Sequence, residues 1–200
     1  IALPETWPAY LDTLSPKREK RIEYERRHLS RAARVESNIS VEPGEVMASY
    51  GSFVVLHQRL WNARGRPGCF ASRHFSSFME KVTNRLAERR NVMLQSLIVN
   101  GEPVAVFYLL LRGARIFYYN SGVDPDEYRS HSPGNIGLGH VIEGAIQRGM
   151  KEFHFFKGRL ESYKGHWTDK TLPVSTVVVC RRSWRTLLVR RILRFRGRVV

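Results

Sequence analysis

Three runs typical of β-strands stand close together in the middle of this chain, and they constrain its fold more than any other feature. The runs read "VMLQSLIV", "PVAVFYLLL" and "RIFYYNSG". Asn100-Gly101 separates the first two runs and favours a tight hairpin turn, and Gly113 separates the second run from the third. Connections this short join neighbouring antiparallel strands, so the sequence predicts three consecutive antiparallel strands.

One strand and two amphipathic helices are predicted before these three strands. In "VESNISV", residues 35–41, apolar residues alternate with polar ones, which is typical of a strand. From residue 46 to 61, and again from 75 to 86, apolar residues recur every three or four positions, which is typical of a helix with one buried face. The segment 17–34 follows the helix start Ser15-Pro16 and is mostly charged, so we expect a helical arm rather than a core helix.

A glycine-punctuated loop and a further helix follow the three strands. The loop reads "SPGNIGLG", and the helix is expected to run to Arg148 and to end at Gly149. Further along, "KEFHFF" predicts a short strand, "ESYKGHW" one helical turn, "VSTVVVC" a last strand and "SWRTLLVRRILRF" a basic amphipathic helix. This order of elements indicates an α/β (α+β) fold with a mixed, mostly antiparallel twisted sheet flanked by helices.

The chain is strongly basic, with a formal net charge of +15, and the charge is concentrated at its two ends. Residues 17–34 hold eight basic and three acidic residues, and residues 181–198 hold eight arginines and no acid. Such segments favour contact with anionic partners such as lipid, nucleic acid or a cofactor phosphate. The alternative is that the arginines only solvate exposed faces. For the C-terminal helix, 183–200, peripheral contact with a membrane competes with docking on a protein surface.

Composition places the chain among globular proteins. Apolar residues make up 42% of its 200 residues, enough to fill the core of one domain. No apolar run approaches membrane-spanning length, and the N-terminal residues lack a signal-peptide pattern. Cys69 and Cys180 have no metal-type spacing, and we expect two reduced thiols. We therefore expect a cytoplasmic protein without a metal. Because the chain begins with Ile1, we expect a fragment or a processed chain.

The order of elements, together with several local motifs, resembles the GNAT superfamily of acyl-CoA-dependent N-acyltransferases. The motifs are "RLW", "GRPGCF", "VNGEPVA", "YYNSGVDPDEY" followed by "SPG", and "FHFFKGRLESYKGHW". They resemble one branch in particular, the acetyltransferase-like domain found in cellulose and exopolysaccharide gene neighbourhoods. That branch is related in fold to the Fem-type aminoacyl transferases of peptidoglycan. The resemblance covers roughly residues 15–182.

The resemblance implies a division of the chain into three segments. Residues 1–34 are then a helical arm or linker from a preceding domain, 35–182 the GNAT-like acyltransferase domain, and 183–200 the basic C-terminal helix. Members of this branch usually carry a preceding, degenerate copy of the fold. An acceptor site shared between two such halves is then incomplete in this chain.

By the same resemblance, the pyrophosphate of an acyl-CoA binds at the loop "SPGNIGLG". A helix N-terminus offers unpaired N–H donors and the positive end of the helix dipole, and glycine lets a phosphate approach the backbone closely. We expect the Ser132 side chain to cap this helix. The alternative is an ordinary helix start with glycines, including Gly139, used for packing, and lysines that are merely solvated. The residues predicted to bind the cofactor are Ser132, Pro133, Gly134, Asn135, Ile136, Gly137, Lys157 and Lys164.

Acyl transfer to an amine needs a donor for the thioester oxygen, a base or water for the amine proton, and an acid for the departing thiolate. The resemblance makes Tyr163 the predicted acid, and the alternative is a buried structural tyrosine. The candidate bases are Glu161 in the same motif, His154 on the predicted short strand and Asp124 in an Asp-Pro pair. The alternative for His154 is a structural role, and the alternative for Asp124 is that it only starts a turn.

The sequence therefore predicts an N-acyltransferase that moves an acetyl or other acyl group from acyl-CoA to an amino group of a sugar or other small acceptor. Polysaccharide or cell-envelope biosynthesis is the expected setting. Two alternatives stay open. One is a Fem-like transferase that uses aminoacyl-tRNA, which the basic ends suit, although no long coiled-coil arm is evident. The other is a non-catalytic scaffold or binding module on a degenerate acyltransferase fold.

Overall fold

The computed structural model describes residues 1–126, 128–156 and 163–173. They form one five-stranded sheet in the order β1-β2-β3-β4-β5. Neighbouring strands from β1 to β4 are antiparallel, and β5 is parallel to β4. The bounds are β1 Val35–Ser40, β2 Val92–Val99, β3 Glu102–Arg112, β4 Arg115–Val123 and β5 Glu152–His154.

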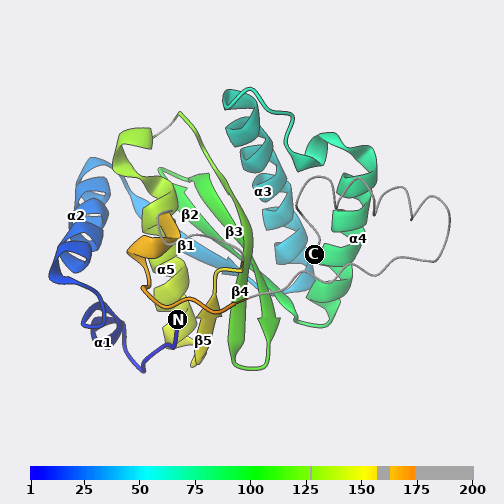
Figure 1. Ribbon diagram of the computed structural model, residues 1–200. Helices are drawn as coiled ribbons and strands as arrows, with labels where there is room; N and C mark the ends of the chain where they lie inside the picture. Colours follow the sequence, from blue (N-terminus) through cyan, green and yellow to red (C-terminus); the bar gives the residue numbers. More distant parts are fainter. Residues whose placement is uncertain (127, 157–162, 174–200) are drawn as a thin grey trace, which may run out of the picture.

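Helices cover both faces of this sheet (Figure 1). One face carries α3 and α4, and the other carries α5, with α1 and α2 packed outside α5. The helices are α1 Trp7–Leu11, α2 Pro16–Ala32, α3 Pro43–Ala63, α4 Arg73–Glu88 and α5 Pro133–Gln147, with the 3-10 turns η1 Cys69–Ala71, η2 Arg129–His131 and η3 Tyr163–His166. The mixed, mostly antiparallel sheet flanked by helices confirms the predicted fold class.

Strand alternation divides the interior into two hydrophobic cores, one on each face of the sheet. On β3, Phe107 and Leu109 belong to the core beneath α5, while Val106 and Tyr108 belong to the core beneath α3 and α4. All four side chains are at most 2% exposed. The central strands are therefore apolar on both faces, which explains why the runs "VMLQSLIV" and "PVAVFYLLL" lack a polar alternation.

The helix over residues 16–32 differs from the arm that its charge led us to expect. Its few apolar side chains are buried, Ile22 at 5% and Leu29 at 0% exposure, and both belong to the core that α5 covers. Figure 1 shows α2 lying beside α5. The expectation that this segment is not a core helix was wrong, because two well-spaced apolar residues suffice to dock a helix whose other faces remain in water.

An irregularity in β4 shapes the middle of the sheet. The register between β3 and β4 shifts between the pairs Tyr108–Asn120 and Leu109–Tyr118, so Tyr119 is an extra residue, a β-bulge. On its other side, β4 pairs with β5 only through residues 115–117. Within the described chain, residues 118–123 of β4 therefore continue without a neighbouring strand on that side. The pairing of the two parallel strands therefore ends just before the bulge, and we refer to the space beside residues 118–123 as the gap between β4 and β5.

The remaining predicted elements are confirmed with small changes of boundary. The helix start at Ser15-Pro16 is observed, although the Ser15 side chain makes no capping hydrogen bond. The short strand and the single helical turn correspond to β5 and η3. The expected last strand and C-terminal amphipathic helix lie outside the described residues.

Close packing of α5 on the sheet gives a first prediction. A Cβ added at Gly137 would lie 2.5 Å from Cε2 of Phe107, a side chain that is 2% exposed. We expect Gly137→Ala to lower the free energy of unfolding by about 1–2 kcal/mol, because overpacking outweighs the better helix propensity of alanine. Urea denaturation measures this change.

Gly51 in α3 is the matched control, since a Cβ there meets nothing within 4 Å. Gly51→Ala is expected to leave the protein as stable or to stabilise it by up to about 1 kcal/mol. Equal effects of the two substitutions would contradict the close approach of α5 to β3.

Candidate active site

The N-terminus of α5 is the first part of the candidate site. Ser132 precedes the helix in a left-handed conformation, with φ 54° and ψ 53°. Its carbonyl accepts the N–H groups of Asn135 at 2.9 Å and Ile136 at 3.1 Å. Among the described residues, the Gly134 N–H has no hydrogen-bond acceptor. This end of the helix therefore presents a donor and the positive end of the helix dipole to an anion.

The side chain of Ser132 does not cap α5, so that expectation was wrong. Capping by serine needs an extended backbone at the capping residue, and a left-handed one aims the hydroxyl elsewhere. Pro133 is buried and has no N–H to offer. Only backbone groups of this turn, and the Ser132 hydroxyl, remain to contact a ligand.

The next residues of the loop motif serve packing and tertiary hydrogen bonds. The Asn135 amide donates to Glu25 of α2 at 2.6 Å, and its oxygen accepts the indole N–H of Trp167 at 3.2 Å. Ile136 is 3% exposed and lies in the core. A Cβ at Gly139 would lie 3.1 Å from the Trp167 ring, and Gly137 faces Phe107. The structure thus supports the packing role for these glycines.

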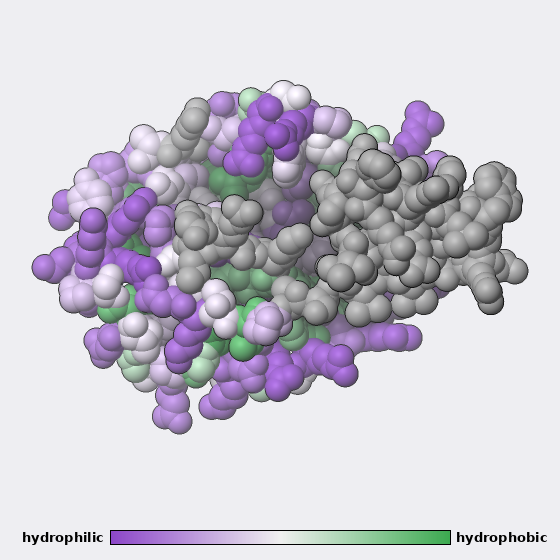
Figure 2. Space-filling view, in the orientation of Figure 1, coloured by the Kyte–Doolittle hydropathy of each residue, from purple (hydrophilic) through white to green (hydrophobic). Residues whose placement is uncertain are grey.

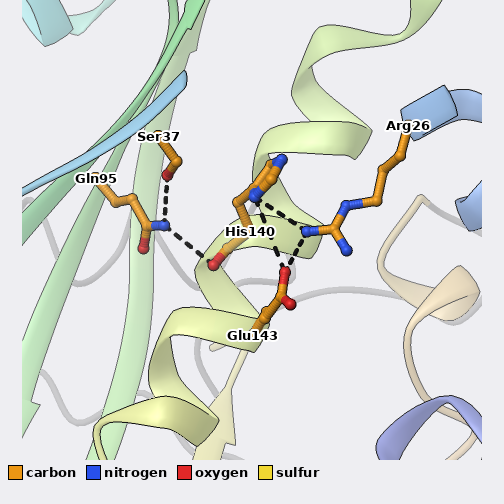
Figure 3. A network of polar contacts seen from close by, with 5 residues as sticks. All are labelled: Arg26, Ser37, Gln95, His140 and Glu143. Atoms are coloured by element: carbon orange, nitrogen blue, oxygen red, sulfur yellow. Dashed lines mark hydrogen bonds and ion pairs between the residues drawn. The ribbon is translucent and has the colours of Figure 1, made fainter. Parts of the chain in front are cut away.

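A polar network on the side of α5 holds this helix to α2 and to the sheet (Figure 3). Arg26 of α2 forms an ion pair with Glu143 and donates to His140 Nδ1 at 3.0 Å. Gln95 of β2 donates to the His140 carbonyl at 3.0 Å and to Ser37 of β1 at 2.9 Å. Burial and the Arg26 charge lower the pKa of His140 to about 4, against the opposing effect of Glu143. His140 is therefore a neutral acceptor at neutral pH.

The second part of the candidate site lies where β4 and β5 part. The Tyr163 hydroxyl of η3 donates to the Tyr118 hydroxyl at 3.1 Å, and the Tyr118 hydroxyl lies 2.7 Å from the Ser121 hydroxyl. These groups form a chain from η3 to the bulged half of β4. Burial, followed by the neighbouring Tyr118 hydroxyl, raises the pKa of Tyr163, and burial also raises the pKa of Tyr118. Both tyrosines are protonated at neutral pH.

Lys164 lies beside this hydroxyl chain. Its ammonium donates to the carbonyl of Phe155, directly after β5, at 2.8 Å. It also lies 5.6 Å from the centre of the Tyr118 ring and 5.9 Å from that of Phe155. The side chain therefore bridges β4 and the end of β5, and its burial lowers the pKa of the amine. The expected contact of Lys164 with a cofactor phosphate stays a prediction.

The candidate bases are less well placed. His154 lies 2.8 Å from a carboxylate oxygen of Glu152, and its ring stacks on Phe117 with centroids 4.9 Å apart, which favours the structural role. Asp124 accepts the backbone N–H of Asp126 at 2.9 Å, as at the start of a turn, and pairs with Arg59 at 3.5 Å. Glu161 and Lys157 lie outside the described residues.

Sequence reasoning missed Tyr118 and Ser121. Both stand in the quoted segment "YYNSG", yet alternation alone gives no reason to prefer Tyr118 to Tyr119. The hairpin register pairs Tyr118 with Leu109, on the face covered by α5, and the bulge after Tyr118 brings Ser121, which pairs with Phe107, to that same face. Tyr119 lies on the other face with its ring near Tyr108, at 5.4 Å between centroids. The available signal was that β4 has one residue more than its antiparallel pairing with β3 can accommodate.

The surface around the site is mixed in character. Figure 2 shows hydrophilic residues around most of the visible face and hydrophobic residues toward its middle. No helix in the described part of the chain is long and apolar enough to cross a bilayer. Within those same residues, histidines, cysteines and carboxylates form no cluster suited to a metal ion.

Comparison with known proteins identifies relatives of this arrangement. A family model described as "Acetyltransferase (GNAT) domain" matches residues 16–165. No curated protein matches the sequence.

Solved structures provide the second comparison. An aminoglycoside acetyltransferase from an uncultured soil metagenomic sample, in complex with trehalose, is 11% identical with a TM-score of 0.51, over 74% of this chain and 97% of that chain. The corresponding complex with sisomicin has 11% identity and a TM-score of 0.50, over 74% and 96%. A possible acetyltransferase from Clostridium difficile 630 is 10% identical with a TM-score of 0.45, over 72% and 99%. Identity this low shows likeness of fold alone.

The lowered pKa of His140 gives a prediction for acid stability. A histidine whose pKa is about 4 in the folded state and about 6.5 in the unfolded state contributes stability above pH 6.5 that is lost as pH falls toward 4. We expect the wild type to lose on the order of 1 kcal/mol more than His140→Asn between pH 7 and pH 5. Urea denaturation at the two pH values tests this. Parallel losses in both proteins would show that His140 does not take up the proton on unfolding.

Proposed function

This chain belongs to the acetyltransferase (GNAT) domain family, and from that membership we propose that it transfers an acetyl group from acetyl-CoA to the amino group of a sugar or other small acceptor. The observation that carries the proposal is the hydroxyl chain of Tyr163, Tyr118 and Ser121 at the point where β4 and β5 part. It supplies a protonated acid, Tyr163, which is 47% exposed, and a route for its proton through Tyr118, which is 5% exposed.

Acetyl-CoA supplies the activated acyl thioester, and its phosphate groups are what the protein is proposed to bind. The N-terminal turn of α5 fits an anion because the Gly134 N–H has no described acceptor and the helix dipole is positive there. The contact comes from the backbone and from Ser132, since the side chains of Asn135 and Ile136 are engaged elsewhere. Binding of the phosphates at this turn leaves the gap between β4 and β5 for the thioester.

Tyr163 acts as the acid that protonates the departing thiolate. The phenol keeps its proton at neutral pH, and because burial raises its pKa and so weakens it as an acid, the transfer depends on its position beside the departing sulfur. The Tyr118 hydroxyl then returns a proton to Tyr163 and takes one from Ser121, and Ser121 regains its proton from water, so that the chain of hydroxyls is restored. The amine proton of the acceptor leaves through water, since His154 is occupied by Glu152 and Phe117.

An amino sugar is the acceptor class that we favour. Two similar structures, with TM-scores of 0.51 and 0.50, are of an aminoglycoside acetyltransferase in complexes with trehalose and sisomicin. A role in polysaccharide or cell-envelope biosynthesis, contact with a preceding GNAT-like half and contact of residues 183–200 with a membrane belong to the same proposal. Transfer from aminoacyl-tRNA or a purely structural role would replace it if acetyl-CoA did not bind.

Acetyl-CoA binding is tested by a pair of variants at one position. Aspartate and asparagine both tolerate the left-handed backbone of Ser132, and they differ mainly in charge. We expect Ser132→Asp to bind acetyl-CoA about tenfold more weakly than Ser132→Asn, on the order of 1.4 kcal/mol, because the carboxylate repels the phosphates. Titration calorimetry with acetyl-CoA, and with pantetheine lacking phosphates as control, measures the difference. Equal affinities for acetyl-CoA would exclude a phosphate at this turn.

The acid role is tested by removing single hydroxyls. Tyr163→Phe is expected to lower kcat by about a hundredfold or more, as for the loss of a general acid, with acetyl-CoA affinity unchanged. Tyr118→Phe is expected to have a smaller effect, because it interrupts only the return of the proton. Release of free CoA thiol, followed with a panel of amino sugars and aminoglycosides, reports the rate. Full activity of Tyr163→Phe would show that another group protonates the departing thiolate.

A further inference from the structure

The amine of Lys164 lies between Tyr118 of β4 and Phe155, directly after β5, and the proposed reaction assigns it no part. Its amine bridges the two parting strands, with the Phe155 carbonyl at 2.8 Å on the β5 side and the Tyr118 ring on the β4 side. Its neighbour in the chain, Tyr163, donates to the hydroxyl of that same Tyr118. An amine and the proposed acid therefore both contact Tyr118.

We propose that Lys164 is a self-acylation site, at which the chain transfers one acetyl group from acetyl-CoA to its own side chain. The inference rests on the proposed function, because the thioester must reach the gap between β4 and β5. It adds an internal acceptor that the search for an external amine would overlook.

The chemistry is the proposed reaction with an internal amine. The neutral amine of Lys164 attacks the thioester carbonyl and forms the N–C bond, and the C–S bond breaks. One amine proton is lost to water and the thiolate receives a proton from Tyr163, so that the products are Nε-acetyl-lysine and CoA with a free thiol. No oxidant or further reactant is required. The amide is stable, so each chain is modified once.

Burial separates Lys164 from the other lysines in the described chain. Lys164 is half-buried, whereas the remaining five are exposed, namely Lys17, Lys20, Lys81, Lys151 and Lys170. Burial lowers the pKa of the Lys164 amine and so raises its neutral, reactive fraction at a given pH. The Phe155 carbonyl holds the amine in place against the ring of Tyr118. Position and protonation both favour this lysine.

Intact-mass spectrometry of the full chain incubated with acetyl-CoA tests the proposal, followed by peptide mapping. We expect the wild type and Lys170→Arg to gain one acetyl group, mapped to Lys164, and Lys164→Arg to gain none at this position. Arginine keeps a cation able to donate to the Phe155 carbonyl, and Lys170 is the exposed lysine of the same segment. Excess CoA is expected to block the labelling of Lys164 at least tenfold. It should not slow the labelling of exposed lysines by acetyl phosphate.

The outcomes separate this inference from the function on which it rests. If calorimetry shows acetyl-CoA binding and amino sugars are acetylated, yet Lys164 stays unmodified, self-acylation is wrong and the acetyltransferase proposal stands. Labelling of Lys164 that CoA does not suppress would show chemical acetylation by free thioester and would likewise overturn it. If acetyl-CoA does not bind at all, both proposals fail. Peptide mapping of the wild type decides the point even if Lys164→Arg does not fold.

Discussion

The close approach of α5 to the sheet is the constraint on which the rest of the structure depends. Gly137 lies directly over the Phe107 ring, and Gly139 lies against Trp167. Without side chains at these positions, the helix settles deep on β3, and its N-terminal turn comes to the same side of the sheet as the bulged half of β4. A bulkier helix would stand off the sheet and carry that turn away from the gap between β4 and β5.

Because α5 packs so closely, polar groups along it are removed from water and need hydrogen-bond partners. Residues from distant segments of the chain provide these partners. Arg26 reaches from α2 to both His140 and Glu143, and Gln95 reaches from β2 to the His140 carbonyl. A single buried side-chain atom in the described chain, Gln95 Oε1, has no hydrogen-bond partner. The network shows why α2 belongs to the fold despite its charge. Arg26 of α2 neutralises Glu143 on the outer side of α5, the helix that carries the proposed phosphate site.

The bulge at Tyr119 creates the other half of the site. The pairing of β4 with β5 ends at Phe117 and His154, and the extra residue follows in β4 directly after Tyr118. Side chains from both strands and from η3 fill the resulting space, among them Tyr118, Tyr163 and Lys164. Their hydroxyls and amine are partly desolvated, which raises the pKa of the phenols and lowers that of the amine. The sheet irregularity thus sets both the geometry and the protonation of the groups that the proposed chemistry uses.

Local pattern was sufficient to predict the elements. The period of apolar residues gave every described strand and long helix from β1 to α5, and glycine and proline marked their ends, because these signals arise within a few residues of chain. The motif order also led to the acetyltransferase (GNAT) family, while the cellulose and exopolysaccharide branch and the relation to Fem-type transferases stay predictions. The packing of α2 escaped prediction because Ile22 and Leu29 are too few for a strong periodic signal, and only the groove beside α5 makes them sufficient.

The candidate site, too, was predicted in part from local sequence and decided in part by tertiary structure. The sequence by itself determined the helix start at Ser132 and the presence of a tyrosine and a lysine after β5. Only tertiary structure decided that the Ser132 hydroxyl does not cap, that Asn135 and His154 have structural partners, and that Tyr163 meets Tyr118 rather than Tyr119. The physical reason is that a hydrogen bond between residues 45 positions apart depends on strand register, and one bulged residue decides that Ser121 lies on the same face as Tyr118.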